Sequence, residues 1–171
     1  MRSDIISIDN KGNGVAAALA EAKTVAQYRG LNDKETLQIE ILTEELMSLA
    51  RSVTGELAAS FWIDSENKDF TLHLSTKTKM DASKRYQLIS TSTANKNEAA
   101  KGFLGFLRDK FESAMLQEEG YHYDVSGNLL DEAAEDKEWD RYERSILRRL
   151  SDEIKIGVRG GKVEMEVKKS F

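Results

Sequence analysis

Two adjacent carboxylates, Glu44 and Glu45, stand inside the stretch LTEELMSLARSVTG at residues 42–55. A carboxylate acts as a general base when it faces a reacting group rather than bulk water. Charged residues in a strongly periodic helix, however, usually lie on its solvent face. The stretch therefore allows two interpretations of Glu44, a catalytic base and a solvated helix residue, and the second is the usual one.

The two histidines offer less chemistry. His73 shares a strand face with Thr71 and Ser75, which is typical of a polar-face residue rather than a ligand. His122 has the chemistry to bind a metal ion or to sense pH, but the chain has no cysteine and no suitably spaced partner for it. No Ser–His–Asp or paired-carboxylate arrangement stands out from ordinary surface charge.

Charge is distributed unevenly along the chain. Residues 117–140 contain about nine acids against a single lysine and show poor periodicity, which predicts an acidic loop or lid. Its acids form either a solvated face or a docking surface for a basic partner. Two basic clusters, Lys84–Arg85 and residues 144–149, pair more simply with this acidic stretch than with an external anion.

Hydrophobic periodicity predicts the elements that must position these side chains. In order, they are a strand at 4–9, a helix at 15–29, a helix from the Asn32 cap to about Thr54, strands at 56–64 and 69–77, helices at 81–89 and 96–116, a helix at about 138–151, and strands at 154–158 and 163–167. The buried stripes of the two long N-terminal helices are Leu19, Ala22, Val25 and Ala26 in the first and Leu42, Leu46, Leu49, Ala50 and Val53 in the second.

Local signals mark the ends of these elements. Gly30 is suited to the position after a helix, and Asn32 with Glu35 forms a capping-box pattern. Residues 65–68 predict a polar turn between two strands, and Gly160–Gly161 predict a tight glycine turn in a terminal hairpin. We expect one α+β domain over residues 1–171, a two-layer sandwich with helices on one face of a mainly antiparallel mixed sheet.

In three places the chain resembles the small anti-sigma-factor serine kinases, which belong to the GHKL superfamily of histidine-kinase-like ATPases. The three stretches are GLNDKETLQIEILTEELMSLA (30–50), SFWIDSENKDFTLHLSTK (60–77) and ILRRLSDEIKIGVRGGKVEMEVKKSF (146–171). The resemblance implies the histidine-kinase-like ATPase fold, and it implies roles for particular positions in three nucleotide-binding boxes.

The first box places a catalytic Glu and a magnesium-binding Asn four residues apart, one turn along a helix. By resemblance Glu44 matches the catalytic Glu, and Ser48 stands where the family has Asn. A serine hydroxyl can still reach Mg²⁺ in some phosphate sites, so Ser48 is the candidate metal ligand and a candidate cofactor-binding residue. The alternative alignment pairs Glu45 with Leu49, which has no ligating atom.

The other two boxes depart further from the family. Its Asp-x-Gly-x-Gly motif, which contacts adenine, is replaced by residues 74–79, where neither Asp nor Gly occurs. Thr76 and Thr78 are the remaining candidate cofactor-binding residues there. The phosphate-binding Gly-x-Gly is replaced by residues 140–144, which lack glycine, whereas Gly102 and Gly105 fall inside a predicted amphipathic helix.

The order of the predicted elements matches that of the family, but the three nucleotide-binding boxes are degenerate. By resemblance, this combination implies a divergent, non-catalytic regulatory or protein-interaction module. Such a module would have a protein partner and no cofactor, with homodimerisation as an option. The alternative is an ATP-binding serine/threonine protein kinase that uses ATP with Mg²⁺, Glu44 as base and Ser48 as metal ligand. A third interpretation is an unrelated α+β protein.

The bulk composition narrows these classes. The net charge of −5 and the pI of about 5.2 argue against general affinity for nucleic acid or an anionic membrane. The absence of cysteine excludes disulfides and thiolate catalysis. No apolar run is long enough to cross a bilayer, and the N-terminus shows no signal-peptide pattern, so we expect a cytoplasmic protein.

Overall fold

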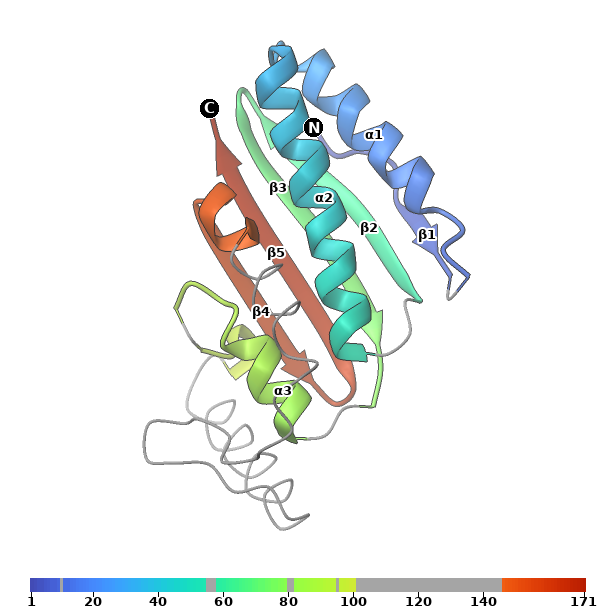
Figure 1. Ribbon diagram of the computed structural model, residues 1–171, viewed down its shortest axis with the longest axis vertical. Coiled ribbons are helices and arrows are strands. Elements are labelled where there is room, and N and C mark those ends of the chain that lie inside the picture. The colour runs from blue at the N-terminus through green and yellow to red at the C-terminus, as the bar shows by residue number, and fades with distance from the viewer. Residues whose placement is uncertain (10, 55–57, 80–81, 95, 101–145) are drawn as a thin grey trace.

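The computed structural model describes residues 1–9, 11–54, 58–79, 82–94, 96–100 and 146–171 (Figure 1). The elements are β1 (Ile6–Ile8), α1 (Val15–Tyr28), α2 (Asp33–Thr54), β2 (Ala59–Glu66), β3 (Asp69–Lys77), α3 (Ala82–Ile89), a short 3₁₀ helix η1 (Glu98–Ala100), β4 (Glu153–Arg159) and β5 (Lys162–Ser170). Residues 146–150 are also helical.

The strands form one five-stranded sheet in the order β1-β2-β3-β5-β4, and every neighbouring pair is antiparallel. A parallel contact occurs only as an isolated bridge between Asn97 and Ile156 among the described residues. Helices α1 and α2 run side by side across one face of the sheet (Figure 1). The coarse prediction, an α+β fold with helices on one face of a mainly antiparallel sheet, is confirmed. The prediction of a mixed sheet is wrong for the described strands, because none of them pairs with a parallel neighbour.

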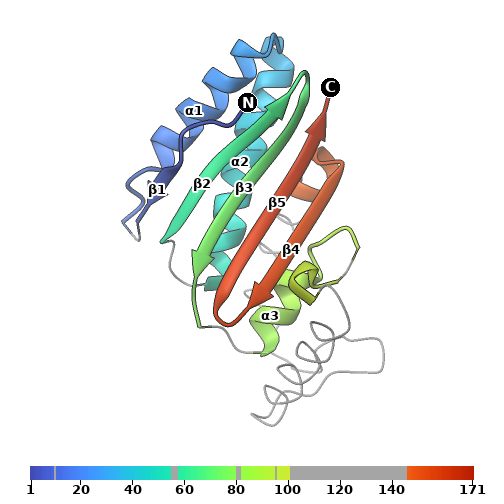
Figure 2. The same ribbon diagram turned by 180° about the vertical axis from the view of Figure 1, so that it is seen from behind.

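Alternation along the strands builds the core between these two layers. Phe61 and Ile63 of β2, Leu72 of β3, Ile156 of β4 and Val167 of β5 are fully buried and point toward the helices. Polar side chains occupy the intervening positions, as expected for a sheet with one covered face. Figure 2 shows the opposite face of the sheet in front, with α1 and α2 behind it.

The two long helices form as the sequence predicts. Among the described side chains of the two buried stripes, Leu19 differs from the prediction, and the side chain of Val53 lies outside the described residues. Ala18 is fully buried and Leu19 only half-buried, so the contact between α1 and its neighbours is made by small side chains rather than by the predicted Leu19. Gly14 precedes α1 with φ of 92°, and a Cβ there would lie 2.2 Å from the backbone oxygen of Ser7. Small residues therefore let α1 lie close to the sheet.

The capping signals of α2 are confirmed. The backbone N–H of Asn32 donates to Glu35 Oε2 at 2.9 Å, and the backbone N–H of Glu35 donates to Asn32 Oδ1 at 3.0 Å. This is the reciprocal capping box. Gly30 has φ of 75° and closes α1, with the Leu31 N–H bonded to the Ala26 carbonyl.

The turn between β2 and β3 is tighter than predicted. Glu66 pairs with Asp69, so the loop is only Asn67 and Lys68 rather than residues 65–68. Asn67 adopts φ of 52°, a conformation that asparagine tolerates better than most residues. The shorter loop extends β2 to Glu66 and changes which side chains face one another across the hairpin.

The beginning of the predicted helix at 96–116 is also different. Lys96 and Asn97 are not helical, and Asn97 instead bonds to the outer edge of β4. Its side-chain amide donates to the Val158 carbonyl at 2.9 Å and accepts from the Val158 N–H at 2.8 Å. The cause is that the open edge of β4 needs hydrogen-bonding partners, which local helix propensity does not take into account.

Several predictions fall on residues 55–57 and 101–145 and so lie outside the described residues. They are the helix end at Gly55, most of the helix at 96–116, the acidic lid at 117–140, the start of the final helix, the replacement of the third box at 140–144, and the interpretations of Gly102, Gly105 and His122. Among the described helices, none is long and apolar enough to cross a membrane.

Candidate functional site

Helix α2 carries the first pair of predicted site residues. Glu44 and Ser48 lie one turn apart, Glu44 exposed and Ser48 half-buried. The neighbouring Leu42 and Leu46 are fully buried, so the pair lies toward the outer margin of the helix. Neither side chain forms a hydrogen bond or ion pair with any residue that the structure describes. Both are accessible, and the fold does not use them.

In the alternative alignment of the first box, the position of the metal ligand falls on a buried residue. Leu49 is only 3% exposed and belongs to the hydrophobic core, so it has neither a ligating atom nor access to a ligand. Glu45 is half-buried on α2. Glu45 and Leu49 keep the same four-residue spacing, so the two pairs differ in that Ser48 has a hydroxyl outside the core and Leu49 does not.

The second pair of predicted residues lies at the end of β3. Thr76 is 3% exposed, and its hydroxyl donates to the Ala58 carbonyl at 2.7 Å. Its donor hydrogen is therefore used inside the fold. Thr78 is half-buried, its backbone N–H donates to the Gly161 carbonyl at 2.8 Å, and its hydroxyl donates to the Lys79 carbonyl at 3.2 Å. These bonds tie the end of β3 to the hairpin turn of β4 and β5.

A groove of about 460 Å³ opens beside Thr78. Its lining residues are Ala58, Lys77, Thr78, Lys79, Gly160, Gly161 and Lys162. The structure thus places one of the four predicted site residues, Thr78, in a concave site. Within the described part of the chain, no hydrogen bond or ion pair joins Glu44 or Ser48 to Thr76 or Thr78.

The uncovered face of the sheet holds a second cluster. Trp62 and His73 are direct cross-strand partners, and their rings stack with centroids 4.8 Å apart and planes 5° apart. His73 Nε2 lies 3.1 Å from Asp64 Oδ2, and His73 Nδ1 lies 3.9 Å from Glu166 Oε1. Arg2 binds Asp64 through two 2.8 Å hydrogen bonds and lies 5.9 Å from the Trp62 ring.

Electrostatics within this cluster shift two pKa values. The hydrogen bond from the Arg2 guanidinium lowers the pKa of Asp64 below its usual 3.8. Burial lowers the pKa of His73 below its usual 6.5, and this effect outweighs the opposing attraction of Glu166 and Asp64. His73 is therefore held in its neutral form at neutral pH, stacked on Trp62 and next to Asp64.

Both the groove and this cluster were missed in the sequence. His73 was correctly predicted on the polar strand face, but the four-residue turn predicted at 65–68 would have put Thr71, not His73, opposite Trp62. A predicted two-residue turn at Asn67 and Lys68 would have placed His73 opposite Trp62. The groove could not be found from periodicity, because it brings together the end of β3 and the β4–β5 turn, which are about 80 residues apart in the chain.

The basic clusters predicted near residues 84 and 148 take part in packing. Arg85 is 6% exposed, and Arg148 Nη2 donates to the Ser92 carbonyl at 3.2 Å. Among the described residues, no three His, Asp or Glu side chains gather as a set that could hold a metal ion.

Comparison with known proteins gives no identification. No protein-family model matches the chain, and no characterised protein matches its sequence.

Proposed function

We propose that this chain is a divergent, non-catalytic regulatory or protein-interaction module with a histidine-kinase-like ATPase fold. The observation that carries the proposal is the end of β3, where the resemblance expects an adenine-binding Asp and close-approach glycines. Lys77, Thr78 and Lys79 occupy this end, and the buried hydroxyl of Thr76 is committed to the Ala58 carbonyl. Lysine side chains add bulk and charge where a flat, neutral base would bind.

The uncovered sheet face supports the interaction role. Trp62 and Arg2 lie there side by side, and these residue types are enriched among the side chains that dominate binding energy at protein interfaces. The long helices lie on the other face (Figure 2). A protein partner that covers Trp62 would bury an aromatic surface already held rigid by its stack on His73.

A second candidate function is ATP-dependent phosphorylation of a protein partner. The observation that favours it is on α2, where Glu44 and Ser48 keep the one-turn spacing and remain accessible. In that case Ser48 would hold Mg²⁺, and Glu44 would accept the proton of the attacking hydroxyl.

Thermal melting separates the two functions. The full chain is melted with and without millimolar Mg-ATP, and the same is done with Glu44→Ala and Ser48→Ala. A ligand at about 100 times its Kd stabilises a protein by about 2.7 kcal/mol, which is a shift of several degrees at this size. We expect no shift that depends on Mg²⁺ and on the α2 pair.

Lys34→Ala is the matched control, because Lys34 is also exposed on α2 but lies nearly three turns before Glu44. A Mg²⁺-dependent shift that survives in Lys34→Ala and disappears in Glu44→Ala would contradict the proposed function and support the kinase.

A further inference from the structure

Three cations stand in one row across the end of the sheet. Lys77 of β3 pairs directly with Lys162 of β5, and Lys162 pairs directly with Arg159 of β4. All three are exposed. Like charges that face one another on adjacent strands destabilise a sheet, and this row occurs in a chain whose net charge is −5. The row therefore costs the fold stability unless an anion neutralises it.

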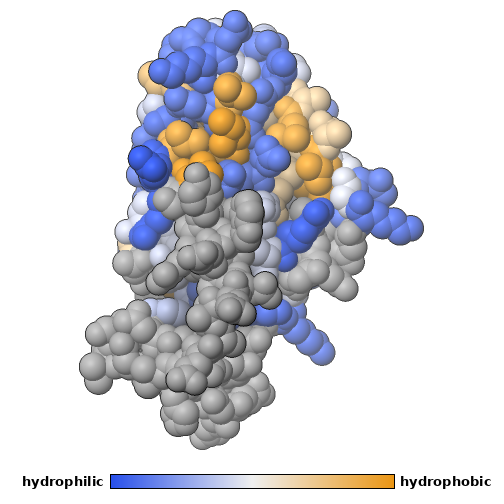
Figure 3. All heavy atoms as spheres, in the orientation of Figure 1, coloured by the Kyte–Doolittle hydropathy of each residue, from blue (hydrophilic) through white to orange (hydrophobic). Residues whose placement is uncertain are grey.

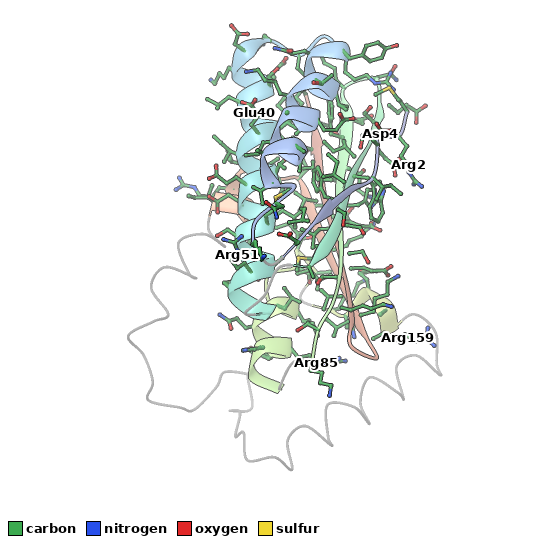
Figure 4. All side chains as sticks on the ribbon, turned by 90° about the vertical axis from the view of Figure 1, so that its right-hand side faces the viewer. Arg2, Asp4, Glu40, Arg51, Arg85 and Arg159 are labelled. Carbon is green, nitrogen blue, oxygen red and sulfur yellow. The ribbon has the colours of Figure 1, made fainter. Side chains whose placement is uncertain are left out.

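The charge of the row is only partly balanced within the protein. Lys162 Nζ contacts Glu164 Oε1 at 2.5 Å. Within the described part of the chain, no ion pair engages Lys77, Lys79 or Arg159. Figure 4 shows Arg159 at the same end of the molecule as Arg85, away from Arg2 and Asp4. Lys77, Lys79, Lys162 and Arg159 thus stand together at this end of the sheet.

The turn between β4 and β5 adds backbone donors. Gly160 and Gly161 have φ of 55° and 75°, the left-handed conformations of a type I′ turn. The ladder closes at the pair of Arg159 with Lys162, so the N–H groups of both glycines lie beyond it. Successive backbone N–H groups in a turn form a concavity suited to anions. A Cβ at Gly161 would lie 3.1 Å from the Thr78 oxygen, so this side of the groove requires glycine.

The size of the groove indicates the kind of anion. Its volume of about 460 Å³ lies in the range of small-molecule sites. A concave site with Lys77, Lys79 and Lys162 on its walls offers several ammonium donors to one compact, multiply charged group. A phosphate group fits that description better than an extended acidic peptide, which needs a longer surface.

We propose that this groove binds a phosphate-bearing small molecule, held by Lys77, Lys79 and Lys162 and by the Gly160–Gly161 turn. The site is separate from the α2 pair of the kinase alternative, because it uses neither Glu44 nor Ser48 and requires no magnesium. It rests on the same end of β3 as the proposed function, where Lys77, Thr78 and Lys79 line the groove. A regulatory module with such a groove would respond to the concentration of its phosphorylated ligand.

Titration calorimetry of the full chain with inorganic pyrophosphate tests this site, in low salt and with a chelator that removes Mg²⁺. We expect saturable binding that weakens as salt rises. Loss of one charge-assisted contact weakens binding by about tenfold or more, so Lys77→Gln and Lys79→Gln should each show that loss. Lys34→Gln makes the same charge change outside the groove and should bind as wild type does.

Two further readouts distinguish a binding role from a structural one. Lys77→Gln removes a like-charge contact with Lys162, so without ligand it should melt no lower than wild type. Pyrophosphate should also move the amide NMR signals of Gly160 and Gly161. The proposal is overturned if pyrophosphate does not bind, if both groove variants bind it as wild type does, or if an acidic peptide binds the groove more tightly than pyrophosphate.

Discussion

His73 illustrates how a single residue on the open sheet face is controlled by opposing forces. Burial against Trp62 favours the neutral imidazole, whereas Glu166 and Asp64 favour the charged form and Arg2 disfavours it. Burial is the largest of these effects, and the pKa of His73 is lowered. The imidazole therefore resists protonation in the folded protein at a pH where it accepts a proton in the unfolded chain.

This difference predicts a pH-dependent stability. The unfolded chain binds a proton at His73 near pH 6.5, and the folded protein does so only at lower pH. The free energy of unfolding contributed by His73 is therefore fully present above about pH 6.5 and falls as the pH drops toward the lower folded pKa. Urea unfolding of wild type at about pH 7.5 and about pH 5.5 measures this change.

His73→Gln is the comparison variant, because glutamine keeps hydrogen-bonding capacity beside Asp64 but does not titrate. Its stability should change less between the two pH values than that of wild type. The other histidine, His122, and the carboxylates are present in both proteins, so their effects cancel. Equal pH dependence in the two proteins would contradict the assigned direction of the pKa shift.

Among the elements, the two edge strands of the sheet are kept from pairing with other chains in different ways. At the outer edge of β4, Thr93 bonds Ile154 and Asn97 bonds both backbone groups of Val158. β1, at the other edge, is only three residues long. Both devices limit the exposed strand edge that would otherwise pair with other chains.

Asn97→Ala should therefore destabilise the protein. The substitution leaves the Val158 N–H and carbonyl without the partners at 2.8 and 2.9 Å, and Asn97 is only 9% exposed. Loss of buried hydrogen-bond partners costs about 1–3 kcal/mol, measurable by urea unfolding. Lys96→Ala should change stability by less than about 0.5 kcal/mol, because that lysine is exposed and its ion pair is superficial. Equal effects of the two substitutions would disprove the role of Asn97.

The elements were largely predictable because their signals are local. The capping box of Asn32 with Glu35 and the Gly160–Gly161 turn depend on neighbouring residues, and both are confirmed. The errors at the Asn67–Lys68 loop and at Asn97 arise where the local structure is decided by pairing with another strand. Alternation in β2 and β3 is compatible with more than one hairpin loop, and the demand of the β4 edge for partners is invisible in residues 95–100.

For the whole molecule, periodicity predicts the two layers but not the arrangement within the sheet. β5, rather than the earlier β4, lies next to β3, which brings Lys77 and Lys162 opposite each other and creates the groove. Helix α2 lies across the other face of the sheet. Figure 3 shows hydrophobic patches on this side of the molecule, and Leu37 of α2 is 52% exposed. The sequence thus predicted Thr78 as a site residue. Its neighbours in the groove were not predictable, because they depend on the order of the strands in the sheet.

For the whole molecule, we propose that a histidine-kinase-like fold is kept without ATP chemistry. Incubation of the full chain with Mg-ATP, followed by measurement of ADP, tests this proposal. We predict that ADP release by wild type equals release by Glu44→Ala, both at the level of buffer alone. ADP release above that level by wild type, abolished in Glu44→Ala and retained in Lys34→Ala, would contradict the proposal.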